Sequence, residues 1–288
     1  MLTVTFIRHG QSTDNVRHVW AGWADAPLSQ RGKTQAEALG AYFSKTLFTK
    51  IYASPLKRAA TTAALFLAAQ PAPQPPHDFT IESIKEQKFG IAEGKPWCSP
   101  DNRSSKSLSE YMSEGKYPTP LPGERFTDGE SDEDLAARAM QAVDEVIMPH
   151  VRSAMRARRA EHIALVSHGL CIRALICALL ERDSRNISPS RGYTGMQNTA
   201  WARAIIEMQD VADGTPLEIT DEDNPLIVTV TDFGRTDHLA KLKPNAGGTG
   251  KIAYDPKQRD IRAFFDGAAN TKDCESDALD GINREAKK

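Results

Sequence analysis

The pattern of apolar and polar positions alternates between short apolar runs and longer segments with a helical period. Runs rich in β-branched and aromatic residues lie at Val4 to Ile7, Ile51 to Ala53, Ile163 to Ser167, Trp201 to Met208 and Leu226 to Thr231. Their length and composition predict buried strands. Between them, apolar residues three or four positions apart predict helices that begin at Ser29, Ser54 and Ser131, each a good N-cap.

This alternation of strands and helices predicts an α/β fold, a three-layer α/β/α sandwich around a mostly parallel sheet. We expect residues 1–240 to form this domain. The stretch 95–130 is rich in Ser, Pro, Gly and charge, which predicts a long insertion covering one end of the sheet. Beyond it, residues 241–288 are of low complexity and predict a flexible tail.

Composition narrows the classes of function. A formal net charge of −2 over 288 residues produces no long-range field that would attract nucleic acid or an anionic membrane. No apolar run is long enough to span a bilayer, and the first strand leaves no room for a secretory signal. The four cysteines have no metal-ligand spacing. We therefore expect a reducing, cytoplasmic location, with the nucleus as a further possibility.

Two predicted strands end in the same way. The first ends in Arg8-His9-Gly10, and the strand Ile163 to Ser167 ends in His168-Gly169. Ligands bind at the carboxyl ends of strands in open α/β sheets. A glycine after each histidine would let backbone N–H groups approach a ligand closely. The alternative is a surface Arg-His pair on a turn and a packed histidine at a strand end.

A third basic group, Arg58, falls in the first turn of the helix expected to begin with Ser54 as cap and Pro55 as first helical residue. That turn also offers free N–H groups and a partial positive charge. Two histidines and two arginines at strand ends predict a pocket for a dianion, because the guanidinium fork donates to two phosphate oxygens. A solvated helix arginine is the alternative for Arg58.

Six segments together resemble a known family. "RHGQSTDN", "GWADAPLSQRGKTQA", "ASPLKRAATTA", "KEQKFGIAEG", "GES" and "LVSHGLCIRAL" occur in the order found in the histidine phosphatase superfamily, phosphoglycerate-mutase-like branch. The resemblance covers roughly Thr3 to Leu239 and implies that family's fold. The ending "TVTDFGRTDHL" also looks like the small broad-specificity phosphatases of this branch.

The resemblance implies a role for each matching residue. His9 would be the nucleophile that forms a phosphohistidine, with its second ring nitrogen oriented by a backbone carbonyl. Charge on the phosphoryl oxygens would be held by Arg8, Arg58 and His168. The substrate-binding set would also include Asn15, Gly22 and Gly169. The resemblance implies no metal or other cofactor, because the arginines do what magnesium does elsewhere.

The acid is the least defined part of the expected site. Glu86 falls where the family keeps the residue that protonates the leaving alkoxide and then activates water. Glu82 and Glu93 are close in sequence, and Glu93 is the reserve candidate. Two polar segments also have two interpretations. Residues 11–13 either touch the ligand or cap the next turn, and "GES" at 129–131 is either a family motif or a cap for the next helix.

Three functions follow from these residues. Mutases carry "ERHYG"-like residues after their acid, whereas this chain has Glu86-Gln87-Lys88-Phe89-Gly90, and Ala21 stands where mutases usually keep threonine. We therefore predict a metal-independent phosphomonoesterase that acts on a small phosphorylated metabolite. The alternatives are a phosphoglycerate mutase and a non-catalytic binding module. The complete set of pocket residues favours an enzyme.

A second motif lies in the predicted tail. In "KQRDIRAFF", Gln258, Ile261, Phe264 and Phe265 fit the pattern of peptides that bind replication sliding clamps. A short helical turn would bring the isoleucine and the aromatic rings onto one face, as a plug for an apolar pocket. Such short motifs also occur by chance, and an apolar tail often packs on its own domain.

Overall fold

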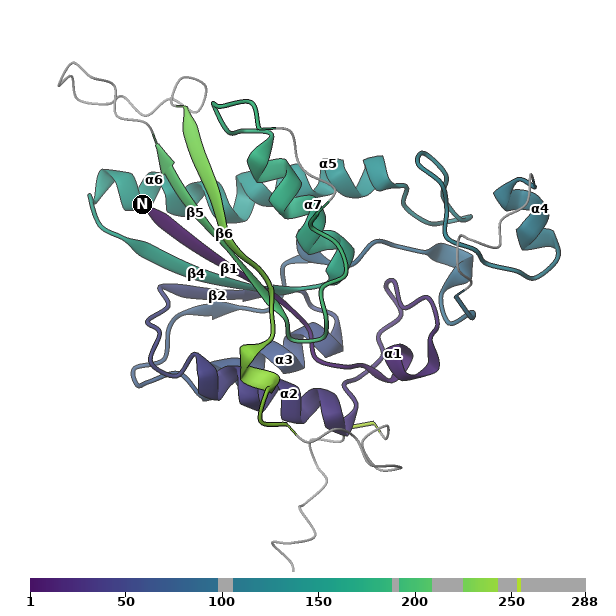
Figure 1. Cartoon of the computed structure of the whole chain (residues 1–288), viewed down its shortest axis with the longest axis horizontal. Helices are drawn as coiled ribbons and strands as arrows, with labels where there is room; N and C mark the ends of the chain where they lie inside the picture. Colours follow the sequence, from purple (N-terminus) through teal and green to yellow (C-terminus); the bar gives the residue numbers. More distant parts are fainter. Residues whose placement is uncertain (98–105, 188–191, 209–224, 243–252, 255–288) are drawn as a thin grey trace, which may run out of the picture. The chain divides into compact units, whose positions relative to one another are not determined.

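The computed structural model describes residues 1–97, 106–187, 192–208, 225–242 and 253–254. Within them, six strands form one sheet in the order β3-β2-β4-β1-β5-β6 (Figure 1). The strands are β1 (Leu2–Arg8), β2 (Lys50–Ala53), β3 (His77–Asp78), β4 (Glu161–Ser167), β5 (Trp201–Met208) and β6 (Leu226–Arg235). The first four are parallel, while β5 is antiparallel to β1 and β6 to β5. The predicted α/β class is confirmed, and the antiparallel pairing is confined to one edge.

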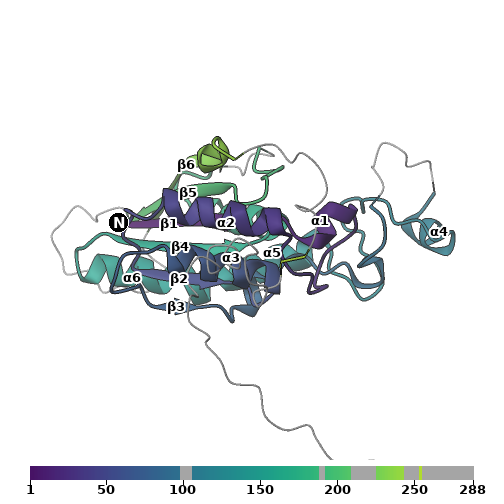
Figure 2. The same cartoon turned by 90° about the horizontal axis from the view of Figure 1, so that it is seen from below.

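Helices cover both faces of the sheet (Figures 1 and 2). They are α1 (Thr13–Arg17), α2 (Gln30–Tyr42), α3 (Lys57–Ala68), α4 (Leu108–Ser113), α5 (Asp132–Ala142), α6 (Met148–Arg156) and α7 (Gly169–Leu180). A π-helical turn at Val143–Ile147 joins α5 to α6. None of the helices in the described ranges is long and apolar enough to cross a membrane.

The central strands β1 and β4 are mostly apolar because both of their faces are buried. In β4, Ile163 and Leu165 pack with α5, α6 and α7, while Ala164 and Val166 pack with α2 and α3. Successive side chains of a strand point to opposite faces, so a strand between two helical layers needs apolar residues at every position. A smaller apolar cluster joins Trp20 to Leu108 and Phe126, both from the predicted insertion.

The predicted helix starts hold at two positions and fail at the third. Ser29 caps α2 by accepting from the N–H of Gly32 at 3.1 Å, and Ser131 caps α5 in a capping box with Asp134. The expectation for Ser54 is wrong, because α3 begins three residues later, at Lys57. The Ser54 hydroxyl instead lies 2.9 Å from Nε2 of His168, a residue far away in the sequence.

The connections of β1 and β4 create the crevice for a site. These strands are neighbours, and Arg8 pairs directly with Ser167. The chain leaves β1 toward α2 on one face of the sheet and leaves β4 toward α7 on the other (Figures 1 and 2). Ligands bind where adjacent strands send their connections to opposite faces. The residues after Arg8 and Ser167, His9 and His168, therefore lie side by side at this point.

Candidate active site

His9 follows the last residue of β1 and is almost completely buried. Its backbone N–H donates to the carbonyl of Ser167 at 3.0 Å, which continues the pairing of β1 with β4. Its Nδ1 lies 2.7 Å from the carbonyl oxygen of Gly10. Because a carbonyl oxygen only accepts, Nδ1 carries the ring proton, and in the neutral ring Nε2 keeps its lone pair.

The surroundings of His9 favour the neutral ring. Burial, followed by the positive charges of Arg58 and Arg8, holds the pKa of His9 well below its ordinary value of 6.5. The hydrogen bond to Gly10 raises the pKa but is the smallest of these effects. The ring is therefore a neutral base at neutral pH, as attack on phosphorus requires.

His168 is fully buried at the N-terminus of α7, and its ring centre is 5.0 Å from that of His9. Its Nε2 contacts the Ser54 hydroxyl at 2.9 Å. Its Nδ1 is buried and has no hydrogen-bond partner among the described residues. Burial, then the charge of Arg58, lowers the pKa of His168 well below 6.5.

The two arginines are held through their terminal nitrogens. Arg58, fully buried in the first turn of α3, donates to the carbonyls of Ala24 at 2.8 Å and Gly22 at 2.7 Å. Arg8 donates to the carbonyl of Met196. The Nε of each arginine is buried without a partner in the described part of the chain. With Nδ1 of His168, these unpaired nitrogens form a site for an anion, since buried polar groups are almost always paired.

The glycines of the site have different reasons for lacking a side chain. At Gly22, with φ +46°, a Cβ would lie 2.3 Å from Oε1 of Glu93. At Gly10, a Cβ would lie 2.5 Å from the carbonyl of Gly32, and the N–H donates to the Thr62 hydroxyl at 3.0 Å. The N–H of Gly10 is therefore already paired within the protein. Gly169 does lie beside the site, with Arg8 Nε 3.8 Å from where its Cβ would be.

The structure separates the three candidate acids. Glu86 Oε1 accepts from the N–H of Cys171 in the first turn of α7, at 3.1 Å, and its charge opposes the lowering of the pKa of Arg8 and Arg58 by burial. Glu93 accepts from the N–H groups of Trp23 at 2.8 Å and Phe89 at 3.1 Å, and so organises a loop. Glu82 is largely exposed and pairs with Lys85. Only Glu86 of the three lines the cavity beside Arg8.

That cavity has a volume of about 200 Å³, and its lining includes Arg8 and Gly169, the chain neighbours of His9 and His168. Besides Arg8 and Glu86, it is lined by Gly169, Leu170, Arg173 and the segment 193–196. Arg173 lies one helical turn beyond Gly169, on the same face of α7. In the described ranges, no carboxylate forms an ion pair with Arg173.

Asn15 lies in α1 and is hydrogen-bonded to Asn198, a residue that the sequence analysis did not identify. Its Oδ1 accepts from the N–H of Ser12 at 3.1 Å and from Nδ2 of Asn198 at 3.0 Å. Asn198 Nδ2 also reaches the carbonyl of His9 at 3.3 Å. Asn198 precedes β5, and its only signal in the sequence is a polar residue next to a strand end. Ser12 caps α1, which was the alternative left open for that segment.

Among the residues that the structure describes, no group of three or more His, Cys, Asp or Glu side chains is placed to hold a metal ion. The positive charge of the site comes from Arg8 and Arg58. The sliding-clamp motif at Gln258, Ile261, Phe264 and Phe265 lies outside the described residues.

The chain is similar to several proteins of known class. A 2,3-bisphosphoglycerate-dependent phosphoglycerate mutase of Brucella canis is 31% identical over 183 residues, which are 62% of this chain and 81% of the relative. A phosphoserine phosphatase (mutant H9A) from Entamoeba histolytica, solved in complex with phosphoserine, has a TM-score of 0.56 at 23% identity and covers 83% of this chain and 100% of its own. A mycobacterial glucosyl-3-phosphoglycerate phosphatase has a TM-score of 0.58 at 21% identity and covers 80% and 98%. The two structures show the shared fold.

The model of one family, the histidine phosphatase superfamily (branch 1), matches residues 4–210. This range runs from β1 through β5 and includes both histidines, both arginines and Glu86. The chain therefore belongs to the histidine phosphatase superfamily, branch 1, and the predicted enzyme class, that of a phosphatase, is confirmed at the level of the family.

Proposed function

We propose that the protein is a metal-independent phosphomonoesterase that transfers the phosphoryl group of a small metabolite to His9 and then to water. The observation that carries this proposal is the neutral, buried His9 ring. Its Nδ1 is fixed by the Gly10 carbonyl, the positive charges of Arg58 and Arg8 act on its ring, and the ring centre of His168 lies 5.0 Å away. A nucleophile, two arginine donors and a second histidine for the phosphoryl oxygens are thus close together.

The proposed reaction has two steps. His9 Nε2 attacks phosphorus, the P–O bond to the leaving group breaks, and Glu86 gives its proton to the leaving oxygen. Water then attacks the phosphorus of the phosphohistidine while Glu86 takes a proton from that water, and the P–N bond breaks to release inorganic phosphate and the free His9 ring. Arg8, Arg58 and His168 stabilise the charge on the phosphoryl oxygens in both steps, with Asn15 and Gly169 at the edge of the phosphate site.

The test is hydrolysis of p-nitrophenyl phosphate by the wild type and by His9→Ala, with a chelator present. We expect chelator-resistant turnover that falls by at least about a thousandfold in His9→Ala, because no other group replaces the nucleophile. The matched control is His150→Ala, at the opposite end of the sheet. Turnover that depends on an added metal, or that survives in His9→Ala, would contradict the proposal.

A phosphoglycerate mutase is the second candidate, favoured by the name of the Brucella relative. The two reactions share the phosphohistidine and differ in its acceptor. Incubation of the protein with 2- or 3-phosphoglycerate distinguishes them, because a mutase interconverts the isomers faster than it releases inorganic phosphate. We expect release of phosphate to dominate, since Gln87 and Phe89 stand where mutases carry the arginine and the tyrosine that grip their substrate.

The tail motif supports a separate proposal, that residues 258–265 bind a replication sliding clamp and bring the enzyme to the nucleus. Its support is the spacing of Gln258, Ile261, Phe264 and Phe265. A peptide spanning Asp255 to Gly267 should bind the clamp in a calorimeter, and no heat of binding would remove this proposal. A clamp-bound chain with no phosphatase activity would instead favour the non-catalytic binding module.

A further inference from the structure

Glu86 lies in a segment without regular structure, between a 3₁₀ turn at Glu82–Ile84 and a second one at Gly90–Ala92. A general acid must be held within hydrogen-bonding reach of the leaving oxygen. Regular hydrogen bonds of a helix or strand do not hold this segment. Its position therefore depends on side chains that reach it from other elements.

Arg138 of α5 reaches this segment and the turn before it with three of its five donors. Its NH1 donates to the carbonyls of Ser83 at 3.0 Å and Lys85 at 2.8 Å, and its NH2 donates to the carbonyl of Glu86 at 3.0 Å. The remaining N–H groups, on Nε and NH2, bind the Glu130 carboxylate at 2.8 and 2.7 Å. A guanidinium has five N–H donors, so every donor of Arg138 is used.

Glu130 completes the attachment from the same side. Its Oε2 also accepts from the N–H of Lys88 at 2.9 Å, and its backbone N–H donates to the Lys88 carbonyl at 2.8 Å. Its backbone carbonyl accepts from Nε2 of Gln87 at 2.9 Å. The Arg138–Glu130 pair therefore contacts the segment on both sides of Glu86. Both side chains are less than a fifth exposed, which strengthens a charge-assisted pair.

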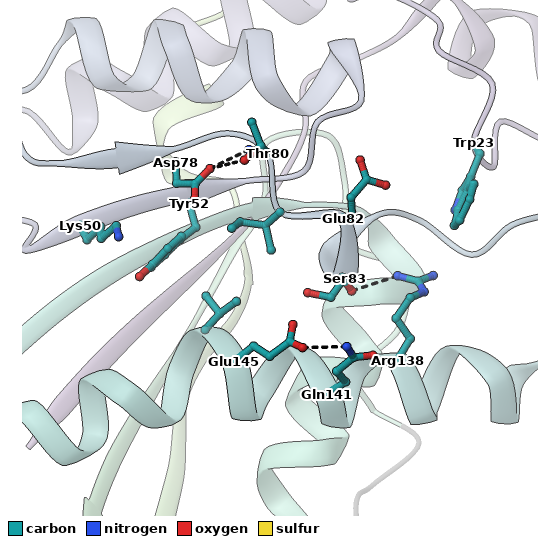
Figure 3. A pocket seen from close by; sticks show the side chains of 12 residues that line it. Trp23, Lys50, Tyr52, Asp78, Thr80, Glu82, Ser83, Arg138, Gln141 and Glu145 are labelled. Carbon is teal, nitrogen blue, oxygen red and sulfur yellow. Dashed lines mark hydrogen bonds between the residues drawn. The ribbon is translucent and has the colours of Figure 1, made fainter.

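A third contact comes from Trp23. Its indole N–H donates to the Glu86 carbonyl at 2.7 Å, so this oxygen accepts from Trp23 and Arg138 together. Figure 3 shows Arg138 projecting from α5 to Ser83 at one end of a cavity of about 570 Å³, which Trp23 also lines. With the backbone of Glu86 fixed, its carboxylate is directed to the N-terminal turn of α7, beside His168.

We infer that Arg138, paired with Glu130, is a positioning residue for Glu86 and thereby determines how well the enzyme protonates its leaving group. The inference rests on the proposed function, in which Glu86 is the acid. In the "GES" segment, Glu130 thus helps to position the acid, while Ser131 supplies the N-cap of α5. Lysine cannot replace Arg138, because an ammonium has three donors and no planar fork.

The experiment compares two substrates for each variant. p-Nitrophenyl phosphate has a good leaving group that needs little protonation, whereas the alkoxide of glycerol 3-phosphate must receive a proton. Glu86→Gln should slow the alkyl ester about a hundredfold more than the aryl ester. Arg138→Met and Arg138→Lys should show the same selectivity, at about tenfold or more. If Arg138 only stabilised the fold, its replacement would slow the hydrolysis of both esters equally.

Two further variants keep the test decisive. Arg182→Met, which removes a surface ion pair with Asp144 just after α7, is the matched control and should leave both rates unchanged. If Arg138→Met does not fold, Glu130→Gln weakens the same attachment more mildly and should show the same selectivity. In the double variant Glu86→Gln/Arg138→Met, the two losses should not add, because both act through one carboxyl group.

The outcomes separate the inference from the proposed function. If Glu86→Gln is selective for the alkyl ester and neither the Arg138 variants nor Glu130→Gln is, the inference is overturned and the proposed mechanism stands. If Glu86→Gln slows both esters equally, Glu86 is not the acid, and both the assignment and the inference fail. Additive losses in the double variant would also overturn the inference.

Discussion

The two ends of β4 each carry a cluster of polar side chains with a histidine, and they differ in how completely these groups are paired. At the first residue, Glu161 accepts from the Ser153 hydroxyl and contacts Nδ1 of His150, both at 2.7 Å. His150 Nε2 lies 2.8 Å from the Tyr52 hydroxyl. At the other end, Nδ1 of His168 and Nε of both site arginines lack a partner within the described residues.

The difference shows how to distinguish a structural network from a binding site. Buried polar groups cost free energy unless they are paired, so a closed network such as Glu161–His150–Tyr52 stabilises the fold. Unpaired donors at the other end persist only because the rest of the fold compensates for their cost, and a bound anion would pair them. Changes at the two ends should therefore affect different measurements: activity at His168, stability at Glu161.

Of the changes that compare the two ends of β4, Arg58→Met should have the largest effect, because it removes a fully buried cation from the phosphate site. kcat/KM for p-nitrophenyl phosphate should fall by about a hundred- to a thousandfold, the usual loss when one donor to a transition-state anion is removed. Arg159→Met is the control at the opposite end, where the arginine is exposed and contacts Glu161. A loss below about tenfold would contradict an anion site at Arg58.

Glu161→Ala should mainly lower stability. The change leaves the Ser153 hydroxyl and His150 without their acceptor, so the free energy of unfolding should fall by about 2–3 kcal/mol. Urea denaturation gives this value, and the kcat of the folded variant should match the wild type. A large loss of kcat in a fully folded variant would contradict the division of roles between the two ends.

Acid should destabilise the protein through its site histidines. An unfolded histidine takes up a proton near pH 6.5, whereas burial and the arginines hold the pKa of folded His168 well below this. Below pH 6.5 the unfolded chain therefore binds the extra proton, and the free energy of unfolding falls. Between pH 7 and 5, in phosphate-free buffer, the wild type should lose more stability than His168→Asn, by up to about 2 kcal/mol, the limit set by the unfolded pKa of 6.5. Equal losses would show that the ring titrates freely in the folded protein.

The smallest expected effect is a change in KM in the variant Arg173→Met, at the cavity beside Arg8. Arg173 lines it without a carboxylate partner in the described ranges, so it suits a second negative group on the substrate. Arg173→Met should raise KM about tenfold for 3-phosphoglycerate, near 1.4 kcal/mol, and leave KM for glycerol 3-phosphate within twofold. An equal change for both substrates would assign Arg173 a general role in the fold.

Local and periodic signals were sufficient for much of the molecule. The apolar runs predicted five of the six strands, and the His-Gly endings of β1 and β4 identified the crevice, because the carboxyl ends of parallel strands meet at one edge. Ser29 and Ser131 cap their helices as expected, because each cap depends only on residues within four positions of it. The short β3, at His77–Asp78, follows a proline-rich stretch, a composition typical of loops and not of strands.

Contacts between residues far apart in the sequence decided the rest. The start of α3 differed because His168 engages the Ser54 hydroxyl, and Gly10 lacks a side chain because the Gly32 carbonyl lies against it. Asn198 and Arg138 had no local signal, since each acts through partners brought to it by the fold. The sequence by itself determined the layers and the two histidines, which follow from periodicity. Only the tertiary structure decided which polar groups are paired, and pairing distinguishes the site from the network at the other end of β4.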